Sequence, residues 1–261
     1  MSDERAATTD WDAESYHRIA GMQERWGLKV LDRLELRGDE VVLDAGCGSG
    51  RMTRHVLDRV PDGRVIGVDA SPSMIEHARG ELGDDDRLEL IVGDLAELDL
   101  EEQVDAIFSN ATLHWVPDHE RLFARLSDVL RPGGRMEVQF GGEGNVREFV
   151  GAIETLAVDP EFSEHLSGLD TPWYFAGTEE TEARLRAAGF EVDSIWLDHY
   201  DEQPDDPYAF MRASGLNAHV ERLPGDLSER FMSRMRELMP EPVTLHYVRL
   251  NVSAATPAPT V

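Results

Sequence analysis

The sequence predicts an α/β fold with a doubly wound, mostly parallel sheet, and two observations predict it. Short apolar runs that suit buried strands alternate with helical patterns across residues 38–140. Four of these runs also end at or near an acidic or amide side chain, and the carboxyl ends of parallel strands are where such sheets bind ligands. The chain of 261 residues allows one large domain, which we expect to span residues 11–252.

The first half of the chain is expected to hold the cofactor-binding part, residues 38–140, behind leading helices at residues 11–37. Gly21 and Gly27 are expected to break the leading pattern into two helices. Apolar runs predict five strands, at residues 40–44, 64–69, 88–92, 104–110 and 135–140. The helices between them are expected at residues 51–60, 71–82 and 118–130. Units of these lengths favour parallel pairing.

The alternation of strands and helices changes after residue 141, and we expect residues 141–252 to form a substrate-binding half with a helical cap. Helical patterns predict helices at residues 145–157, 178–188, 207–222 and 226–239. Two more strands are expected, at residues 190–197 and 243–252. The polar residues 1–10 are expected to be disordered, and residues 253–261 to form a loose tail.

The charge excludes one class of partner. Acidic residues number 52 and basic residues 25, for a net charge of −27, and Lys29 is the only lysine. Nucleic-acid binding needs a basic face to neutralise phosphates, so we expect no nucleic-acid partner. The acids are spread over the whole chain, which favours adaptation to a salty cytoplasm over a local acidic binding surface.

Composition also bounds the location and the inorganic chemistry. No apolar run approaches 18 residues and no signal-peptide pattern is present, so we expect a cytoplasmic protein with no membrane partner. The single cysteine, Cys47, rules out an internal disulfide and a cysteine-based zinc site. The nine histidines are scattered without metal-ligand spacing, so we expect no metal.

A glycine-rich turn follows the first predicted strand. The apolar run stops at Asp44, and Gly46, Gly48 and Gly50 follow at alternate positions. Glycines permit unusual backbone angles and let a ligand approach main-chain N–H groups. A dinucleotide turn has its third glycine one place later, where this chain has Arg51. A carboxylate before the first glycine would also repel a pyrophosphate and suits a ligand with an amino group and a positive centre.

Polar side chains close the next three strands as well. Asp69 ends the second strand, and Ala70 follows it; Asp94 and Leu95 follow the third; Asn110 ends the fourth. Asp94 has an alternative role as a helix cap. Met74, in the helix after Asp69, is a candidate to cover a flat ligand and an equally good candidate for the core.

The segment after the fourth strand contains the candidate catalytic residue. His114 is the best-placed general base in the chain, because an ordinary histidine pKa suits proton removal near neutral pH. The alternative is a histidine that lines the pocket without transferring a proton. Trp115 follows it as a candidate substrate contact. A carboxylate acceptor needs no base, only alignment in a dry pocket.

These motifs resemble a known family. Residues 44–50, read as D-x-G-x-G-x-G after a strand, are similar to motif I of the class I S-adenosylmethionine (SAM)-dependent methyltransferases. The resemblance implies a Rossmann-like seven-stranded sheet with an antiparallel seventh strand, and SAM as the cofactor. It implies that Asp69 accepts the ribose hydroxyls and that Asp94 meets the adenine amino group. The implied cofactor contacts are Asp44, Gly46, Cys47, Gly48, Gly50, Asp69, Ala70, Met74, Asp94, Leu95 and Asn110.

One branch of the family, that of trans-aconitate 2-methyltransferase, is similar over residues 11–252. The shared segments include residues 68–74, 109–119, 130–134 and 171–175. This resemblance implies methyl-ester formation on a small carboxylic acid. Arginines would hold the acid, with Arg147, Arg184, Arg212 and Arg249 as candidates. Tyr16, Trp173 and Tyr174 are further candidates for the substrate pocket.

Three other interpretations stay open at this point. The chain could be a SAM-binding regulator or subunit without catalysis, and the intact motifs do not separate this from an enzyme. A nicotinamide dehydrogenase is opposed by Arg51 and Asp44. A nucleic-acid methyltransferase is opposed by the charge and by the absence of a Pro-Pro-aromatic step after the fourth strand. A monomer or a weak dimer is expected.

Overall fold

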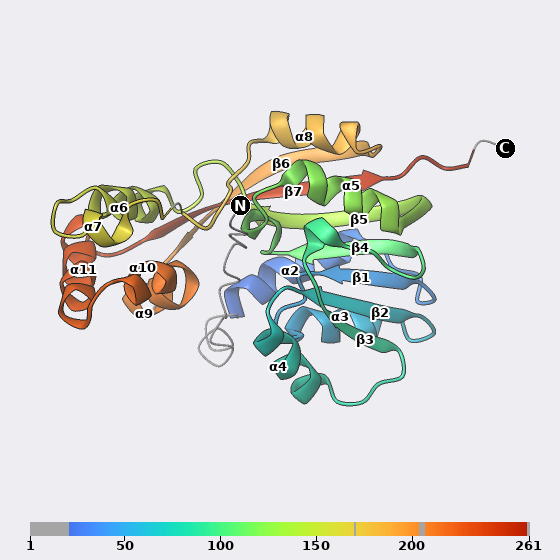
Figure 1. Cartoon of the computed structure of the whole chain (residues 1–261). Helices are drawn as coiled ribbons and strands as arrows, with labels where there is room; N and C mark the ends of the chain where they lie inside the picture. Colours follow the sequence, from blue (N-terminus) through green and yellow to red (C-terminus); the bar gives the residue numbers. More distant parts are fainter. Residues whose placement is uncertain (1–20, 170, 204–206, 260–261) are drawn as a thin grey trace, which may run out of the picture.

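Seven strands form one sheet in the order β3-β2-β1-β4-β5-β7-β6 (Figure 1). The computed structural model describes residues 21–169, 171–203 and 207–259, so Tyr16 and the other predictions for residues 1–20 lie outside the described residues. The strands are β1 Val41–Ala45, β2 Arg64–Asp69, β3 Leu88–Val92, β4 Val104–Asn110, β5 Leu130–Gly141, β6 Glu191–Glu202 and β7 Leu245–Ala255. Strands β1 to β5 pair in parallel, and β7 runs antiparallel to both neighbours. The predicted seven-stranded, mostly parallel sheet is therefore confirmed.

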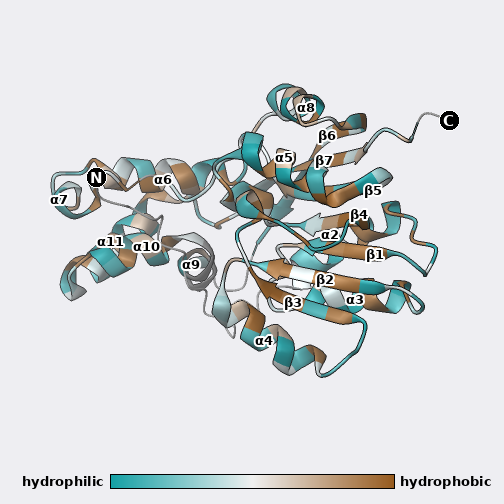
Figure 2. Ribbon diagram, turned by 45° about the vertical axis from the view of Figure 1, so that its right-hand side comes forward, coloured by the Kyte–Doolittle hydropathy of each residue, from teal (hydrophilic) through white to brown (hydrophobic). Residues whose placement is uncertain are grey.

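Helices cover both faces of this sheet, as the doubly wound prediction requires. The first group is α2 Gly21–Arg33, α3 Arg51–Arg59 and α4 Pro72–Leu82. The second is the short turn η1 Leu95–Glu97 with α5 His119–Val129 and α8 Thr178–Ala187. Separate apolar cores form on the two sides, one under α2 and α3 and one under α5 and α8. Figure 2 shows the apolar residues gathered in the strands and on the helix surfaces that meet them. None of the described helices is long and apolar enough to cross a membrane.

A C-terminal helical group lies beyond one end of the sheet (Figure 1). Its members are α6 Arg147–Ala157, α7 Ser163–Leu166, α9 Pro207–Met211, the π-helical turn η3 Arg212–Leu216, α10 Asn217–Arg222 and α11 Gly225–Leu238. The group has a core of its own, in which Phe162 and Phe231 meet edge to face at 5.4 Å. The same core includes Trp26 of α2 and Tyr247 of β7, so the group is packed onto the sheet.

The leading helix differs from its prediction. Helix α2 runs through Gly27 without a break. A Cβ at Gly27 would lie 2.8 Å from both Asn110 Nδ2 and Met52 Sδ. Gly27 therefore allows α2 to lie close to the sheet. A glycine in a sequence can mark either a helix break or such a close approach, and the residue alone does not distinguish the two.

Several strand boundaries also differ from prediction, and β6 continues to Glu202 beyond its predicted end at residue 197. Residues 131–134 were expected to form only a stop between a helix and a strand, but β5 already begins at Leu130. The pairing of β4 with β5 shifts register there, so these residues form a bulge inside the strand. Residues 253–255 were expected in the loose tail, but they extend β7 because they pair with both β5 and β6.

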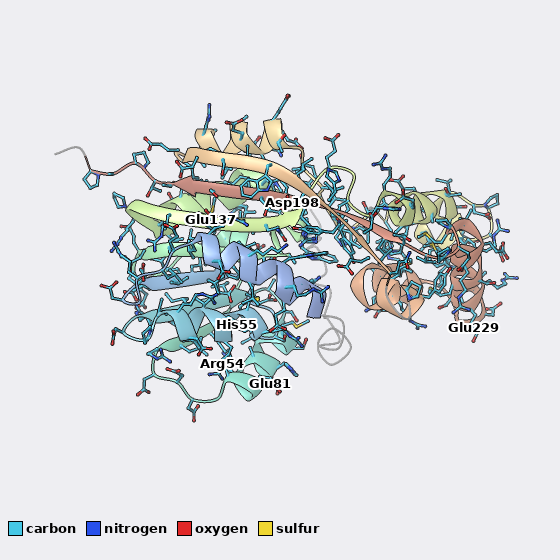
Figure 3. All side chains as sticks on the ribbon, turned by 180° about the vertical axis from the view of Figure 1, so that it is seen from behind. Arg54, His55, Glu81, Glu137, Asp198 and Glu229 are labelled. Carbon is cyan, nitrogen blue, oxygen red and sulfur yellow. The ribbon has the colours of Figure 1, made fainter. Side chains whose placement is uncertain are left out.

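A polar layer joins α2 to the strands beneath it. Arg33 donates to Glu137 Oε2 at 2.9 Å and to Asn251 Oδ1 at 3.2 Å. Asn251 in turn donates to Asp198 Oδ2 at 3.1 Å. Glu137 and Asp198 lie on the side of the sheet that α2 covers (Figure 3). These bonds fix α2 against β5, β7 and β6.

A buried ion pair lies at the N-terminal end of strand β1. Glu40, directly before β1, is 1% exposed and accepts hydrogen bonds from the backbone N–H groups of Arg37 and Gly38, each at 2.9 Å. Arg135 of β5 donates to it at 2.6 Å. Burial opposes ionisation, but the bonds from Arg135 and the backbone outweigh it and lower the pKa of Glu40 to about 2. Glu40 therefore ties the start of β1 to β5.

We expect Glu40→Gln to lower the free energy of unfolding by about 3 kcal/mol at neutral pH, because the variant leaves Arg135 without its counter-charge. The folded pKa of about 2 lies below the ordinary value of 4.5. The stabilisation is therefore present above pH 4.5 and lost as the pH falls towards 2. Urea denaturation at several pH values measures this. The exposed Glu101→Gln serves as control, and a difference from wild type that does not change with pH would contradict the assignment.

Candidate active site

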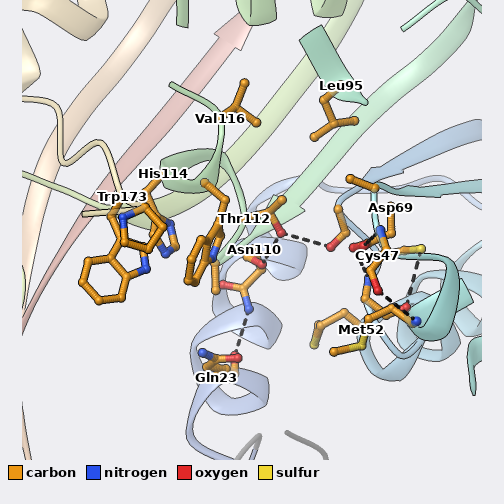
Figure 4. Close-up of a pocket in the computed structure, with 18 of the residues that line it drawn as sticks. Gln23, Cys47, Met52, Asp69, Leu95, Asn110, Thr112, His114, Val116 and Trp173 are labelled. Carbon is orange, nitrogen blue, oxygen red and sulfur yellow. Dashed lines mark hydrogen bonds between the residues drawn. The ribbon is translucent and has the colours of Figure 1, made fainter. Parts of the chain in front are cut away.

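The carboxyl ends of β1, β2 and β4 and the turn after β3 open onto one cavity of about 680 Å³ (Figure 4). The cavity continues past β4 to the C-terminal helical group and β7. We call its two parts the glycine-turn end and the β7 end. The β7 end is lined by His114, Trp115, Asn145, Val146, Phe149, Pro172, Trp173, Met211, Leu245, Tyr247 and Arg249.

The three glycines of the turn after β1 all have left-handed backbone angles, with φ of 82°, 53° and 83° for Gly46, Gly48 and Gly50. A Cβ at Gly46 would lie 2.0 Å from Thr112 Cγ2, and one at Gly50 would lie 2.7 Å from Leu82 Cδ1. A Cβ at Gly48 would meet nothing within 4 Å. Gly46 and Gly48 line the cavity, whereas Gly50, predicted as a cofactor contact, instead packs the turn against α4.

The turn is held from below by β2. The N–H groups of Gly46 and Cys47 both donate to the carbonyl of Val68, at 2.8 and 3.0 Å. Cys47 lines the cavity but is buried, and burial raises the pKa of its thiol well above the ordinary range. The thiol therefore stays protonated and is a packing group, not a nucleophile.

Asp44 is the most unusual group in the cavity. Its carboxylate is 1% exposed and accepts a hydrogen bond from Thr53 Oγ1 at 2.7 Å. Burial raises the pKa of Asp44 to about 7, the Thr53 bond opposes the rise and the nearby charge of Asp69 adds to it. A carboxylate in this position gains most from a cation in the cavity.

Asp69 lies beside the turn at the end of β2. Its two oxygens accept N–H bonds from Gly48 and Ser71, both at 2.9 Å. Burial raises the pKa of Asp69, and these two bonds oppose the rise. Ala70 and Met74 line the same part of the cavity, and Met74 is buried at the start of α4.

The predicted contacts after β3 and β4 also reach the cavity. Asp94 caps η1 through a bond from Ala96 N–H at 2.9 Å, which is its alternative role, and it lines the cavity beside the buried Leu95. Asn110 donates to the carbonyl of Gln23 at 3.0 Å. Its Oδ1 is buried and accepts no hydrogen bond from any residue within the described ranges.

The glycine-turn end fits SAM and does not fit a dinucleotide. Asp44 and Asp69 place two carboxylates where a pyrophosphate would lie, and Arg51 is paired with Glu24 at 2.9 Å. A cationic ligand with an amino group would relieve the desolvated Asp44. The open space at Gly48 lets such a ligand approach the main chain. The described residues contain no group of three or more His, Cys, Asp and Glu side chains that could hold a metal ion.

His114 lies in the turn η2 Leu113–Trp115, directly after β4. Ala111, with φ of 60°, bends the chain into this turn. The ring is 7% exposed, and its Nδ1 accepts a hydrogen bond from Gly141 N–H at 3.2 Å. Burial, with the charge of Arg249 and His119, lowers the pKa of His114 well below its ordinary value. The neutral ring then carries its proton on Nε2, which is a hydrogen-bond donor and not a base.

Of the predicted aromatic pocket residues within the described ranges, two line this cavity and one does not. Trp115 and Trp173 both line the cavity and meet edge to face at 5.6 Å. Tyr174, also predicted as a pocket wall, is absent from the lining of this cavity. Its hydroxyl donates to Glu180 at 2.8 Å and accepts from Arg184 at 2.9 Å. Tyr174 instead lines a neighbouring second cavity, whose lining it shares with Trp173.

Only one of the four candidate arginines reaches the cavity. Arg147 is exposed at the start of α6 and does not line it, so this prediction is corrected. Arg212 is also exposed, and Arg184 is bound to Tyr174 and Glu180. Arg249 of β7 is 2% exposed, lines the β7 end and stands over the ring of Trp26 at 5.2 Å.

Sequence reasoning missed several residues of the β7 end. Leu245 and Tyr247 line the cavity together with Arg249, at every second position of one strand. This spacing places the three side chains on one face of β7, and it was readable in the sequence. No periodic signal marks Asn145 or Met211. Asn145 precedes α6 and Met211 ends α9, so the two residues reach the cavity from separate elements.

Comparison with known proteins agrees with the site. A family model described as a methyltransferase domain matches residues 42–134. Trans-aconitate 2-methyltransferase of Shigella dysenteriae serotype 1 is 31% identical over 236 residues, covering 89% of this chain and 90% of that protein. The same enzyme of Escherichia coli (strain 55989 / EAEC) is 30% identical over equal shares.

Solved structures share the fold. A putative methyltransferase from Bacillus halodurans superposes with a TM-score of 0.62 at 15% identity, over 89% of this chain and 99% of that one. A putative methyltransferase of Haloferax volcanii, solved in complex with the Trm112 activator, has a TM-score of 0.59 at 22% identity, over 96% and 97%. The relatives at 30% and 31% identity, the D-x-G-x-G-x-G turn and the cavity that fits SAM lead to one conclusion. The chain belongs to the class I SAM-dependent methyltransferases and resembles their trans-aconitate 2-methyltransferase branch.

Proposed function

We propose that this enzyme methylates a carboxylate of a small organic acid, with SAM as the methyl donor. The observation that carries the proposal is the position of Arg249. This buried arginine lies at the β7 end of the same cavity that the glycine turn lines at its other end. Arginine binds carboxylates through a planar fork of N–H donors. The names of the relatives, which are trans-aconitate 2-methyltransferases, support an acid as the acceptor.

The glycine-turn end would hold the cofactor. In this proposal Asp44 receives the amino end of SAM, and Asp69 accepts the ribose hydroxyls. Met74 and Leu95 would line the space for the adenine, and Asp94 would accept a bond from its amino group. Bound SAM supplies a methyl carbon to a carboxylate lone pair, and the electron pair of the broken carbon–sulfur bond stays on sulfur, which leaves S-adenosylhomocysteine.

The β7 end would hold the acceptor. Arg249 anchors one carboxylate, and Nε2–H of His114 donates a second bond to the acid. A carboxylate is already ionised at neutral pH, so methyl transfer to it needs no general base. This chemistry matches a buried histidine whose only proton is held for donation.

The C-terminal helical group would act as the cap over the acceptor. It contributes Phe149 and Met211 to the lining of the β7 end, and Val146 precedes its first helix. These apolar side chains and Trp115 would exclude water from the acceptor, which strengthens the pairing of its carboxylate with Arg249.

The expectations about partners and surroundings remain part of the proposal. The net charge of −27 supports a small-molecule acceptor over a nucleic acid, and the near absence of lysine supports adaptation to salt. The cytoplasmic location and the monomer or weak dimer stay predictions from the sequence.

We expect the affinity of wild type for S-adenosylhomocysteine to rise with pH through about 7, because the ammonium of the ligand pairs with the ionised form of Asp44. Asp44→Asn should bind at least tenfold more weakly at pH 8 and without this pH dependence. Calorimetric titration measures both, with the exposed Asp62→Asn as control. An unchanged affinity in Asp44→Asn would remove Asp44 from the cofactor site.

The same variant should be more stable than wild type when no ligand is bound. The folded pKa of Asp44, about 7, lies above the ordinary value of 3.8. Its stability contribution is therefore present below pH 3.8 and lost as the pH rises through 7. Above pH 7 we expect Asp44→Asn to gain on the order of a few kcal/mol over wild type in denaturant unfolding.

Turnover of trans-aconitate, related small acids and their amides tests the acceptor class. We expect methyl esters and S-adenosylhomocysteine from acids and no product from amides. Arg249→Met should raise KM for the acid by on the order of 100-fold, as the loss of a charge-assisted pair implies, with the affinity for S-adenosylhomocysteine unchanged. Arg147→Met, on the exposed start of α6, is the matched control.

The outcomes separate the possible functions. Equal turnover of acids by wild type and a folded Arg249→Met would remove Arg249 from the acceptor site. Binding of S-adenosylhomocysteine without turnover of any acid would contradict the proposal and favour a non-catalytic SAM-binding regulator.

Two variants of His114 distinguish a donor from a base. Asparagine can donate a hydrogen bond but cannot remove a proton at neutral pH. We expect His114→Asn to keep kcat within a few-fold of wild type and His114→Ala to lose on the order of tenfold, the value of one hydrogen bond. Initial rates at saturating SAM measure this. Equal and complete loss in both variants would instead identify His114 as the general base.

A further inference from the structure

Trp173 is shared by two neighbouring cavities. A second cavity, of about 490 Å³, adjoins the β7 end of the active-site cavity. The linings of the two cavities have Pro117, Pro172 and Trp173 in common. Trp173 is the largest of these side chains, so its indole ring is the main part of the partition between the two spaces.

Aromatic contacts hold the ring in this position. Trp173 stacks on Phe175 at 5.8 Å with only 9° between the rings. It meets Trp115 edge to face at 5.6 Å and Phe149 at 5.9 Å. Two of these neighbours, Trp115 and Phe149, themselves line the active-site cavity. The ring is therefore a fixed wall of that cavity.

The six-membered ring of the indole also lies directly against a glycine. A Cβ at Gly215 would lie 2.1 Å from Cζ2 and 2.3 Å from Cη2 of Trp173. Gly215 lies in the π-helical turn η3 that separates α9 from α10. A π-helical turn is rare and is often found at functional sites. Here it brings a residue without a side chain against the indole.

The second cavity suits an apolar extension of a ligand. Ile153, Ala157 and Leu169 line it, and the exposed Glu154 is the only acidic side chain in its lining among the described residues. His219, also in its lining, is fully buried, and burial lowers its pKa, so the ring is neutral. Among the described residues that line the cavity, none carries a positive charge that would attract a second carboxylate.

We infer that Trp173, seated on Gly215, closes the β7 end and sets the length of the acceptor that the enzyme admits. The second cavity is the space that a longer, apolar acceptor would enter if the ring were absent. This inference rests on the proposed function in taking the acceptor as an acid held by Arg249. Trp173 and Gly215 thus determine specificity for size, and Arg249 determines specificity for charge.

Two substitutions alter the partition in different ways. Trp173→Ala removes it and joins the two cavities. Gly215→Ala inserts a Cβ where the ring now lies, so the ring must leave its present position. Gly151→Ala is the matched control, because it adds the same methyl group to α6 of the same helical group, where a Cβ meets nothing within 4 Å.

The measurement is calorimetric binding of straight-chain alkanoates of increasing length, and of their neutral N-methylamides, to protein saturated with S-adenosylhomocysteine. For wild type we expect the affinity to stop rising at a limiting length. In Trp173→Ala the limit should move to longer chains, with about fourfold tighter binding for each methylene that enters the second cavity. In Gly215→Ala the limit should change because the ring is displaced, and in Gly151→Ala it should stay.

The inference is overturned if the limiting length is the same in all four proteins, or if Trp173→Ala binds neither series better than wild type. Comparing alkanoates with their N-methylamides tests the partition separately from the proposed carboxylate acceptor. A shift of the limit with no preference for acids over amides would support the partition and contradict the carboxylate acceptor. A preference for acids with no shift of the limit would support the carboxylate acceptor and contradict the partition. Saturation with S-adenosylhomocysteine shows that each variant is folded.

Discussion

The desolvated carboxylate of Asp44 is the interaction on which the active site depends. A carboxylate that is 1% exposed and has a pKa of about 7 destabilises the unliganded fold at neutral pH. Thr53 and the left-handed turn at Gly46 nevertheless hold it in place. In the proposed function a bound cation offsets this cost, so a group that is unfavourable for folding contributes affinity for SAM.

The cavity separates its two ligands by charge. Asp44 and Asp69 make the glycine-turn end negative, whereas Arg249 brings a positive charge to the β7 end. In the proposed function a cationic donor and an anionic acceptor are then each favoured at one end and disfavoured at the other. This division lets a protein with a net charge of −27 bind an anionic substrate, because the local field near Arg249 outweighs distant surface charges that solvent and salt screen.

The sequence predicted those features that depend on local pattern. Strands β2, β3 and β4 have the predicted bounds, because each apolar run is closed by polar or glycine residues. Features that depend on a distant neighbour were not predictable. Gly27 looked like a helix breaker because the sequence does not show that Asn110 and Met52 lie against it. Arg147 and Arg249 looked equivalent until the pairing of β7 showed which one faces the cavity.

One position of the sheet fixes the β7 end as a whole. Gly141, the last residue of β5, is paired with Arg249 of β7, and its N–H donates to His114 Nδ1. A Cβ at Gly141 would lie 2.6 Å from Phe175, on which Trp173 stacks. The arginine, the histidine and the tryptophan partition are thus positioned by the register of β5 with β7. Because β5 also pairs with β4, the same register sets their distance from the glycine turn, and in the proposed function the sheet thereby helps to align acceptor and donor.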